Sequence, residues 1–302
     1  MTGLAGPVLR RLVALATAAI VVGLSAPRPV AAQTRPSSAT ATAEAAPLVI
    51  GETFTIQSRI LHEVRRINVY VPPRPGGGDA PLPVLYMPDG GMGEDFLHVA
   101  GLIQVSVGNG TMRPFLLVGI ENTARRRDLT GPTRVAEDRK IAPRVGGSAA
   151  FRAFLRRELM PRVRARYRTT REAAIVGESL AGLFVVETFF LEPALFDTYI
   201  ALDPSLWWNG GELVRRAADR LRGKRPRAPR TLFLAASSQP EIAQLTGQLA
   251  AVLKRGAPRS VSWRYEPMPA EQHSTIYHPA ALRAFRAVLA PRQARPAVEQ
   301  GR

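Results

Sequence analysis

Over residues 54–289, the sequence alternates short apolar runs that predict strands with longer segments whose apolar residues recur at helical spacing. Strands are expected at Phe54–Ser58, Val64–Val71, Val84–Met87, Phe115–Ile120, Ala173–Val176, Thr198–Leu202, Thr231–Ala235 and Val261–Tyr265. Helices are expected at Ala149–Arg166, Leu180–Phe190, Glu212–Leu221, Glu241–Leu253 and Ala280–Leu289. Strands that are separated by helices run parallel, and helices bury both faces of such a sheet. The alternation therefore predicts the α/β class, with a mostly parallel central sheet that begins with an antiparallel pair.

The N-terminal segment, residues 1–32, has the pattern of a secretory signal peptide. Two arginines precede an apolar run from Leu12 to Leu24, which is shorter than the roughly 20 residues that a membrane-spanning helix needs. Small residues for cleavage follow at Val30-Ala31-Ala32, and an uncleaved N-terminal anchor is the alternative. A cleaved signal predicts a periplasmic or secreted protein without a stable membrane span.

The rest of the chain is expected to form one domain with a polar segment at each end. We expect a flexible leader over residues 33–48, because this stretch is small, polar and contains proline. The domain is expected to cover residues 49–290, without an internal linker or repeat, and residues 291–302 to form a flexible tail.

The chain contains no cysteine, which excludes disulfides, cysteine-ligated metal sites and a thiol nucleophile. Its four histidines are His62, His98, His273 and His278. The formal net charge is +17, carried mainly by arginines that are spread along the chain among few aromatic residues. This distribution matches no nucleic-acid-binding motif, so we expect no nucleic-acid partner. The charge favours an anionic small-molecule substrate.

A candidate nucleophile, Ser179, lies between the expected strand Ala173–Val176 and the helix that begins at Leu180. A serine on such a sharp strand-to-helix turn needs small residues two positions before and after it, because larger side chains would collide. Gly177 and Ala181 occupy these positions. The alternative is that Ser179 only caps the helix. The strand–turn–helix context favours the nucleophile.

A serine hydroxyl needs a general base within hydrogen-bonding reach, and we assign this role to His273. It lies in a polar loop after the last expected strand, whereas His278 stands beside a proline at the start of a helix. The carboxylate that orients the histidine is expected after Thr231–Ala235, where the first acid is Glu241. Asp203, at the end of the preceding strand, and a Ser–His dyad without an acid are the alternatives.

Two backbone N–H groups are expected to stabilise the oxyanion of an acyl-transfer reaction. Leu180 directly follows the nucleophile and supplies one of them. The second is assigned to Gly91, because the turn Asp89-Gly90-Gly91 lets the backbone approach a ligand closely. This chemistry needs no cofactor and no metal.

Several stretches spread over about residues 52–290 form a recognisable set of motifs. They are Val84–Gly90, Val118–Asn122, Arg127–Leu129, Phe154–Pro161, Gly177–Leu183, Asp203–Trp208 and Glu271–Thr275. Together they resemble the Putative esterase family of α/β-hydrolases, which includes esterase D, the siderophore trilactone esterases of the enterobactin and salmochelin type, and the mycolyltransferases. The stretches at Asp203–Trp208 and Arg127–Leu129 are most similar to the siderophore esterases.

The resemblance implies an α/β-hydrolase fold and the hydrolysis of carboxylic esters through an acyl-serine intermediate on Ser179, with His273 as the base. Members of the siderophore branch can act with a Ser–His pair, which leaves the assignment of Glu241 open. An iron-siderophore trilactone is the leading specific substrate. Acyl transfer to an alcohol and a non-catalytic, ligand-binding role are the alternatives to hydrolysis.

Three further residues are placed by this resemblance near the substrate. Trp207 and Trp208 follow a strand end and are expected to wall an acyl or aromatic pocket, with a partly core position as the alternative. Arg127 is expected to hold an anionic group of the substrate. The alternative for Arg127 is an ion pair with Asp128 or with another neighbour.

Overall fold

The computed structural model describes residues 45–74, 76–223 and 228–291. The chain divides into two units, Met1–Leu48 and Val49–Arg302, and every helix and strand of the described residues lies in the second unit. The expected signal peptide, residues 1–32, lies outside the described residues, as do most of the expected leader (residues 33–48) and nearly all of the expected tail (residues 291–302).

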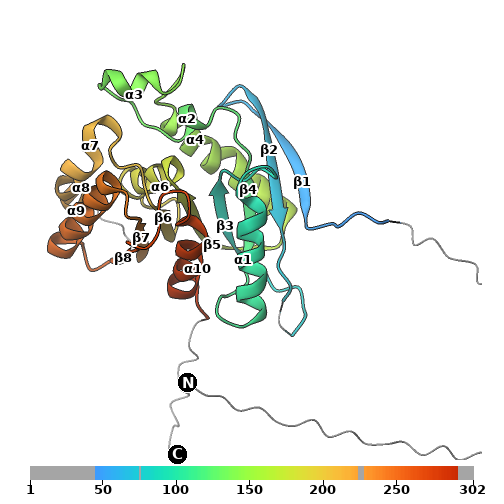
Figure 1. Ribbon diagram of the computed structural model, residues 1–302. Coiled ribbons are helices and arrows are strands. Elements are labelled where there is room, and N and C mark those ends of the chain that lie inside the picture. The colour runs from blue at the N-terminus through green and yellow to red at the C-terminus, as the bar shows by residue number, and fades with distance from the viewer. Residues whose placement is uncertain (1–44, 75, 224–227, 292–302) are drawn as a thin grey trace, which may run out of the picture. The chain divides into compact units, whose positions relative to one another are not determined.

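Unit Val49–Arg302 contains one eight-stranded sheet with the order β1-β2-β4-β3-β5-β6-β7-β8 (Figure 1). β2 runs antiparallel to both β1 and β4, and all other neighbouring pairs are parallel. The strands are β1 (Glu52–Ser58), β2 (Glu63–Tyr70), β3 (Leu82–Pro88), β4 (Leu116–Ile120), β5 (Thr169–Glu178), β6 (Thr198–Leu202), β7 (Arg230–Ala236) and β8 (Val261–Pro267). The predicted α/β class with a mostly parallel sheet and a leading antiparallel pair is confirmed.

Helices cover both faces of this sheet, and each face has its own apolar core. One face is covered by α1 (Phe96–Gly108) and α10 (Tyr277–Val288), which pack against each other (Figure 1). The other face is covered mainly by α4 (Ser148–Phe154), α5 (Met160–Arg166), α6 (Leu180–Leu191), α8 (Ala217–Gly223) and α9 (Pro240–Gly256). Three further helices lie in the connections: α2 (Arg125–Asp128), α3 (Ala136–Lys140) and α7 (Trp208–Arg215).

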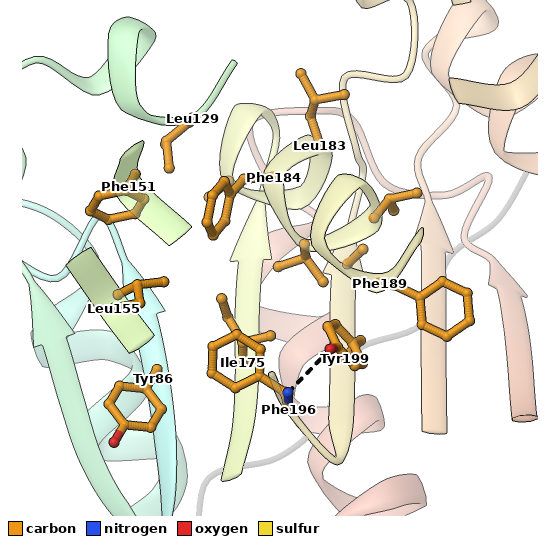
Figure 2. Close-up of a cluster of buried hydrophobic side chains, with 14 of the residues drawn as sticks. Tyr86, Leu129, Phe151, Leu155, Ile175, Leu183, Phe184, Phe189, Phe196 and Tyr199 are labelled. Carbon is orange, nitrogen blue, oxygen red and sulfur yellow. Dashed lines mark hydrogen bonds between the residues drawn. The ribbon is translucent and has the colours of Figure 1, made fainter. Parts of the chain in front are cut away.

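The helix after the candidate nucleophile, α6, is buried on nearly all sides. Figure 2 shows Phe184 of α6 beside Phe151 of α4, with the ring centroids 5.2 Å apart. At the other end of the same cluster, the Tyr199 hydroxyl of β6 accepts a hydrogen bond from the Phe196 N–H at 3.1 Å. A helix that is apolar all round belongs in the interior. This packing holds the N-terminus of α6, and with it Ser179, against the sheet.

Two expected helices differ in detail from the structure. The expected helix Ala149–Arg166 is interrupted by a π-helical turn, Leu155–Leu159, between α4 and α5. Pro161 lies just after this turn; it has no N–H to donate, and its ring would clash with the carbonyl four residues earlier in a regular α-helix. The expected helix Glu212–Leu221 is divided between α7 and α8. α7 includes Trp208, but Asn209, Gly210 and Gly211 have positive φ, so its regular part begins at Glu212, as expected.

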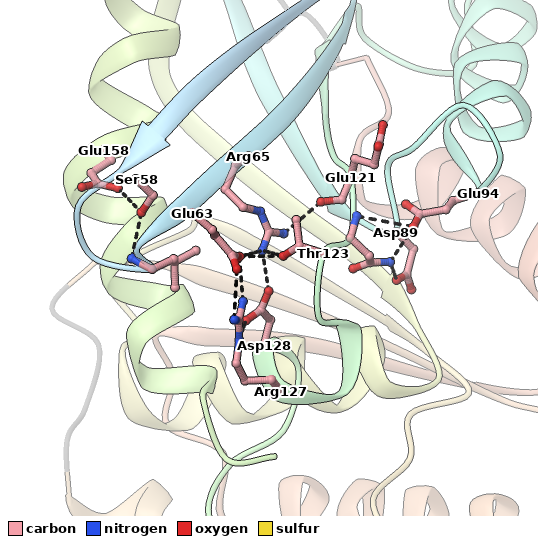
Figure 3. A network of polar contacts seen from close by, with 12 residues as sticks. Ser58, Glu63, Arg65, Asp89, Glu94, Glu121, Thr123, Arg127, Asp128 and Glu158 are labelled. Carbon is pink, nitrogen blue, oxygen red and sulfur yellow. Dashed lines mark hydrogen bonds and ion pairs between the residues drawn. The ribbon is translucent and has the colours of Figure 1, made fainter. Parts of the chain in front are cut away.

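A buried arginine, Arg65 of β2, connects the sheet to the segment that contains α2 (Figure 3). Its side chain is 0% exposed and that of its partner Asp128 is 1% exposed, with an N–O distance of 2.5 Å. The same guanidinium donates to Glu63, to Thr123 and to the carbonyl of Glu121. Because Arg65 lies inside the protein, these partners compensate the free energy lost on dehydrating its charge.

Glu63 belongs to the same network and has a strongly altered acidity. Burial opposes its ionisation, but hydrogen bonds from Arg127, Thr123 and Arg65 outweigh burial and lower the pKa of the carboxyl to about 2. A pKa that is lower in the folded state means that this group stabilises the fold above its unfolded-state pKa. That contribution is lost as the pH falls toward 2.

We expect Arg65→Met to lower the free energy of unfolding by about 3–5 kcal/mol, because the substitution leaves the buried Asp128 carboxylate without its main partner. Chemical denaturation followed by circular dichroism measures this change. Arg216→Met is the matched control, since it removes an exposed ion pair with Glu212 on the protein surface and should change the stability by less than about 0.5 kcal/mol. Equal effects of the two substitutions would contradict the structural role of Arg65.

Candidate active site

The candidate site lies where the neighbouring parallel strands β3, β5, β6 and β7 end. Functional groups in open α/β sheets gather at this edge. The residues that directly follow β3, β5 and β6 all have a positive φ: Asp89 (58°), Ser179 (59°) and Asp203 (46°). Such backbone conformations are rare for residues with a side chain and concentrate at functional sites.

Ser179 occupies a tight turn between β5 and α6, with φ 59° and ψ −120°. Its N–H donates to the carbonyl of Leu202 at 3.1 Å, which ties the turn to the neighbouring strand β6. A Cβ at Gly177 would lie only 2.7 Å from the carbonyl carbon and the Cβ of Ala181. The small residues at positions 177 and 181 are therefore a steric requirement of this turn.

A continuous chain of hydrogen bonds joins three side chains at this edge. The Oγ of Ser179 lies 3.0 Å from Nε2 of His273, and Nδ1 of His273 lies 2.6 Å from Oδ2 of Asp203. Asp203 is fully buried and also accepts hydrogen bonds from the N–H of Ser237 at 2.5 Å and from its hydroxyl at 2.8 Å. The two donors of Ser237 orient the carboxylate so that Oδ2 faces the imidazole.

The carboxylate beside His273 is thus Asp203, whereas sequence reasoning placed Glu241 there. Glu241 is exposed in the first turn of α9. The expectation relied on chain order, which puts the acid after β7. In the structure, the loop after β7 instead supplies Ser237, which binds the acid, and the acid itself directly follows β6. Asp203 was the weighed alternative, and its position at a strand end was the signal in the sequence.

The charges around His273 favour its protonated form. The hydrogen bond from Nδ1 to Asp203 is the largest effect and raises the pKa of His273 above the usual 6.5. Burial lowers this pKa, whereas the charge of the nearby Glu178 carboxyl raises it further. Glu178 itself is mostly buried, and this burial raises the pKa of its carboxyl to about 8. Glu178 Oε1 lies 3.3 Å from Nδ1 of His273, a contact that sequence reasoning missed because Glu178 only appeared as the variable position of the turn.

The two N–H groups expected to bind an oxyanion are in different situations. Leu180 begins α6, and the first N–H groups of a helix have no acceptor within the helix. The N–H of Gly91 donates to Oε2 of Glu94 at 2.7 Å. Glu94 also accepts from the side-chain amide of Asn122 at 2.9 Å, so this carboxylate covers the turn after β3.

The three residues expected to contact substrate are mostly engaged within the protein. Trp208 is buried, and its indole N–H donates to the carbonyl of Gly131 at 2.9 Å, which fits the core alternative. Trp207 is partly exposed and lies beside it, with ring centroids 6.1 Å apart. Arg127 pairs with Glu63 and Asp128, both at 2.7 Å (Figure 3), which is the ion-pair alternative.

A different arginine, Arg125, faces the candidate site. Its guanidinium binds both carboxylate oxygens of Asp89, at 2.7 and 2.8 Å, and its charge acts on Glu178 and His273. About a third of its side chain is exposed (35%). The run of three arginines in the sequence did not distinguish Arg125 from Arg127.

One group of potential metal ligands occurs among the described residues, and it consists of Glu178, Asp203 and His273, whose ligand atoms lie within 4.8 Å of one another. Two of these residues already form the hydrogen bond between Nδ1 of His273 and Oδ2 of Asp203. A cation bound to Nδ1 would replace the proton of that bond, so the two arrangements exclude each other.

The helices of the described residues are all too short or too polar to span a membrane.

We expect the His273 imidazole to titrate above pH 6.5 in the folded protein, because the Asp203 carboxylate stabilises the imidazolium. Proton–nitrogen NMR of the histidine ring measures this titration. Asp203→Asn removes the negative charge and should lower the pKa of His273. A value at or below 6.5 in the unaltered protein would contradict the hydrogen-bonded arrangement.

Comparison with known proteins agrees with this architecture. The family model described as "Putative esterase" matches residues 58–290. The ferri-bacillibactin esterase BesA of Bacillus subtilis is 28% identical over 180 residues, which cover 51% of this chain and 59% of that protein. The siderophore triacetylfusarinine C esterase of Aspergillus fumigatus is 35% identical over 150 residues, 44% of this chain and 47% of that protein. The matches thus span about half the length of these curated relatives.

A solved structure is similar over most of the described domain. The IroE-like serine hydrolase from Shewanella oneidensis superimposes with a TM-score of 0.72 at 26% sequence identity, covering 79% of this chain and 80% of that one. Because the family model spans well over half of the sequence, the chain belongs to the Putative esterase family, and its mostly parallel sheet covered by helices has the α/β-hydrolase fold.

Proposed function

We propose that this protein is a serine esterase that hydrolyses carboxylic esters through an acyl-enzyme on Ser179. The observation that carries the proposal is the hydrogen-bonded sequence from Ser179 Oγ through His273 to Asp203. A serine hydroxyl becomes an effective nucleophile when a base accepts its proton and a third group orients that base. The membership of the esterase family supports the same reaction class.

In the proposed reaction, Ser179 Oγ attacks the ester carbonyl carbon while Nε2 of His273 takes the hydroxyl proton. The tetrahedral intermediate collapses, the carbon–oxygen bond to the alcohol breaks, and His273 passes its proton to the leaving alkoxide. A water molecule then attacks the acyl-serine, again giving a proton to Nε2, and the carboxylic acid leaves as Ser179 regains the proton. Asp203 stays ionised and stabilises the imidazolium through Nδ1.

The oxyanion of the intermediate is proposed to bind the N–H groups of Leu180 and Gly91. The first of these N–H groups lies at the start of α6, where the helix dipole also favours negative charge. The second now donates to Glu94, so the oxyanion must replace that carboxylate as its acceptor. Glu94 is a flexible side chain, which makes this exchange a rotamer change without a backbone movement.

The proposed substrate class is an anionic siderophore ester, and a ferric trilactone is the leading candidate. The names of two relatives describe esterases of the siderophores bacillibactin and triacetylfusarinine C. The net charge of +17 and the partly exposed guanidinium of Arg125 favour an anion. Arg127 binds Asp128 and Glu63 through all three guanidinium nitrogens, whereas Arg125 binds Asp89 through Nε and Nη2 and is more exposed (35% against 15%). We therefore assign the anionic contact to Arg125.

The proposed location is outside the cytoplasm, after cleavage of residues 1–32. This rests on the charge and apolar pattern of that segment alone. N-terminal sequencing of the protein recovered from its producing cells should begin at Gln33. A sequence that begins at the first residues would contradict the cleavage.

The serine assignment is tested by covalent labelling. We expect a fluorophosphonate probe to form one adduct, which mass spectrometry locates on Ser179, because only a hydroxyl activated by a base reacts readily. Ser179→Ala should abolish the adduct and His273→Ala should slow it strongly. Absence of labelling in the folded protein would argue for a non-catalytic, ligand-binding role.

The acid is tested by a pair of substitutions. Asp203→Asn should lower kcat by about 10³–10⁴-fold, because the amide nitrogen would face Nδ1 and impose the wrong tautomer on His273. Glu241→Gln should change kcat by less than about twofold, since Glu241 is exposed in the first turn of α9. Steady-state hydrolysis of a p-nitrophenyl ester measures both. A strong loss in Glu241→Gln with an active Asp203→Asn would reverse the assignment.

The substrate class is tested with a ferric catecholate trilactone beside p-nitrophenyl acetate. We expect a higher kcat/KM for the anionic trilactone and a decrease of this value with rising salt, because salt screens the attraction between the protein and an anion. Chromatography of the linear products measures the cleavage. Efficient cleavage of the neutral ester without cleavage of the trilactone would contradict the siderophore assignment.

A further inference from the structure

The Nδ1 edge of His273 faces two carboxyl groups. Asp203 Oδ2 lies 2.6 Å from Nδ1 and Glu178 Oε1 lies 3.3 Å from it. A neutral imidazole carries one N–H at this edge, and the shorter contact shows that Asp203 accepts it. The reaction described above uses Asp203 and leaves Glu178 without a task.

Glu178 is placed where a carboxyl group is costly. It is the last residue of β5, directly before Ser179, and its side chain is 15% exposed. Its Oε1 is inaccessible to solvent and has no hydrogen-bond partner among the described residues. Burying a polar group without a partner destabilises a protein by about 1–3 kcal/mol. An apolar or amide side chain of similar size would avoid this cost, so the carboxyl calls for an explanation.

The charged and titratable groups that act on Glu178 come from several elements. They are His273 from the loop before α10, Asp203 after β6, Asp89 after β3, Arg125 of α2 and Tyr277 at the start of α10. The guanidinium of Arg125 is already bound to both carboxylate oxygens of Asp89. Nδ1 of His273 lies 3.3 Å from Glu178 Oε1, close to hydrogen-bonding distance.

We propose that Glu178 is a positioning residue that shares the Nδ1–H of His273 with Asp203 and accepts this hydrogen bond when Asp203 cannot. The inference rests on the proposed function, since it concerns the base of that reaction. Its physical effect is to keep the imidazole in the tautomer and orientation in which Nε2 faces Ser179. When Glu178 is ionised, its charge also stabilises the imidazolium that forms when Ser179 loses its proton.

The pH decides whether the Glu178 carboxyl is charged. Burial raises the pKa of Glu178 to about 8, so the group is mostly neutral at pH 7 and ionises as the pH rises through 8. In its ionised form it raises the pKa of His273 and makes Nε2 a stronger base. The structure therefore predicts a second rise of kcat/KM near pH 8, above the rise that reports the deprotonation of His273.

A double-mutant cycle with Glu178→Gln and Asp203→Ala tests the sharing. We expect Glu178→Gln alone to lower kcat by less than about fivefold at pH 7, since Asp203 keeps the hydrogen bond. Asp203→Ala should lose only about 10²-fold, less than the 10³–10⁴-fold of Asp203→Asn, because alanine leaves Nδ1–H free for Glu178. In the Asp203→Ala background, Glu178→Gln should cost about a further 10²-fold.

The proposal is overturned if Glu178→Gln costs the same factor in both backgrounds, or if Asp203→Ala is as inactive as Asp203→Asn. Glu241→Gln is the matched control in both backgrounds, because it makes the same chemical change on an exposed helix turn. Circular dichroism and the thermal midpoint establish that each variant is folded.

The pH profile provides a test that does not need Asp203→Ala to fold. Glu178→Gln should abolish the rise of kcat/KM near pH 8 and leave the lower rise in place, whereas Glu241→Gln should keep both. A rise near pH 8 that persists in Glu178→Gln overturns the proposal. Failure of the proposed function gives a different result, because the unaltered protein would then show neither Ser179 labelling nor ester hydrolysis.

Discussion

The parallel pairing of β5 with β6 is the constraint on which the candidate active site depends. It places Glu178 opposite Leu202, so that the residues directly after these two strands, Ser179 and Asp203, emerge at the same edge of the sheet. The N–H of Ser179 donates to the carbonyl of Leu202, which continues the ladder into the turn. The loop after β8 places His273 beside these two strand ends, where its imidazole contacts the side chains of both Ser179 and Asp203.

The site is strained, and the surrounding core stabilises it. Backbone conformations like those of Asp89, Ser179 and Asp203 cost on the order of 1–3 kcal/mol each. They persist because each residue is held by its neighbours: Asp203 by the two donors of Ser237, Asp89 by Arg125, and Ser179 by the buried helix α6. Glu178 lies beside His273 and is itself mostly buried, which raises the pKa of its carboxyl to about 8.

Sequence reasoning identified the groups whose evidence is local. Ser179 stands out because its small neighbours and the strand–turn–helix pattern are all within a few residues of it. His273 stands out because the chain has only four histidines, and only this one lies in a polar loop after the last strand. The acid was placed at Glu241, but the structure has Asp203 beside His273. Chain order alone does not tell whether the end of β6 or the end of β7 contacts the loop that contains His273, because that loop lies far along the chain from both. Arg127 was expected to contact the substrate, with an ion pair as the alternative, and the structure pairs it with Glu63 and Asp128.

The sequence by itself determined the α/β class, the eight strands within a few residues, the larger helices apart from α1, and the turn that presents Ser179. These features depend on periodicity and on steric rules that act between near neighbours in the chain. Only the tertiary structure decided which carboxylates surround His273, which arginine faces the site and which tryptophan is buried. Such contacts join residues far apart in the chain, and their free energy depends on burial and on competing partners. Both arise only when the strands have paired and the helices have packed on the sheet.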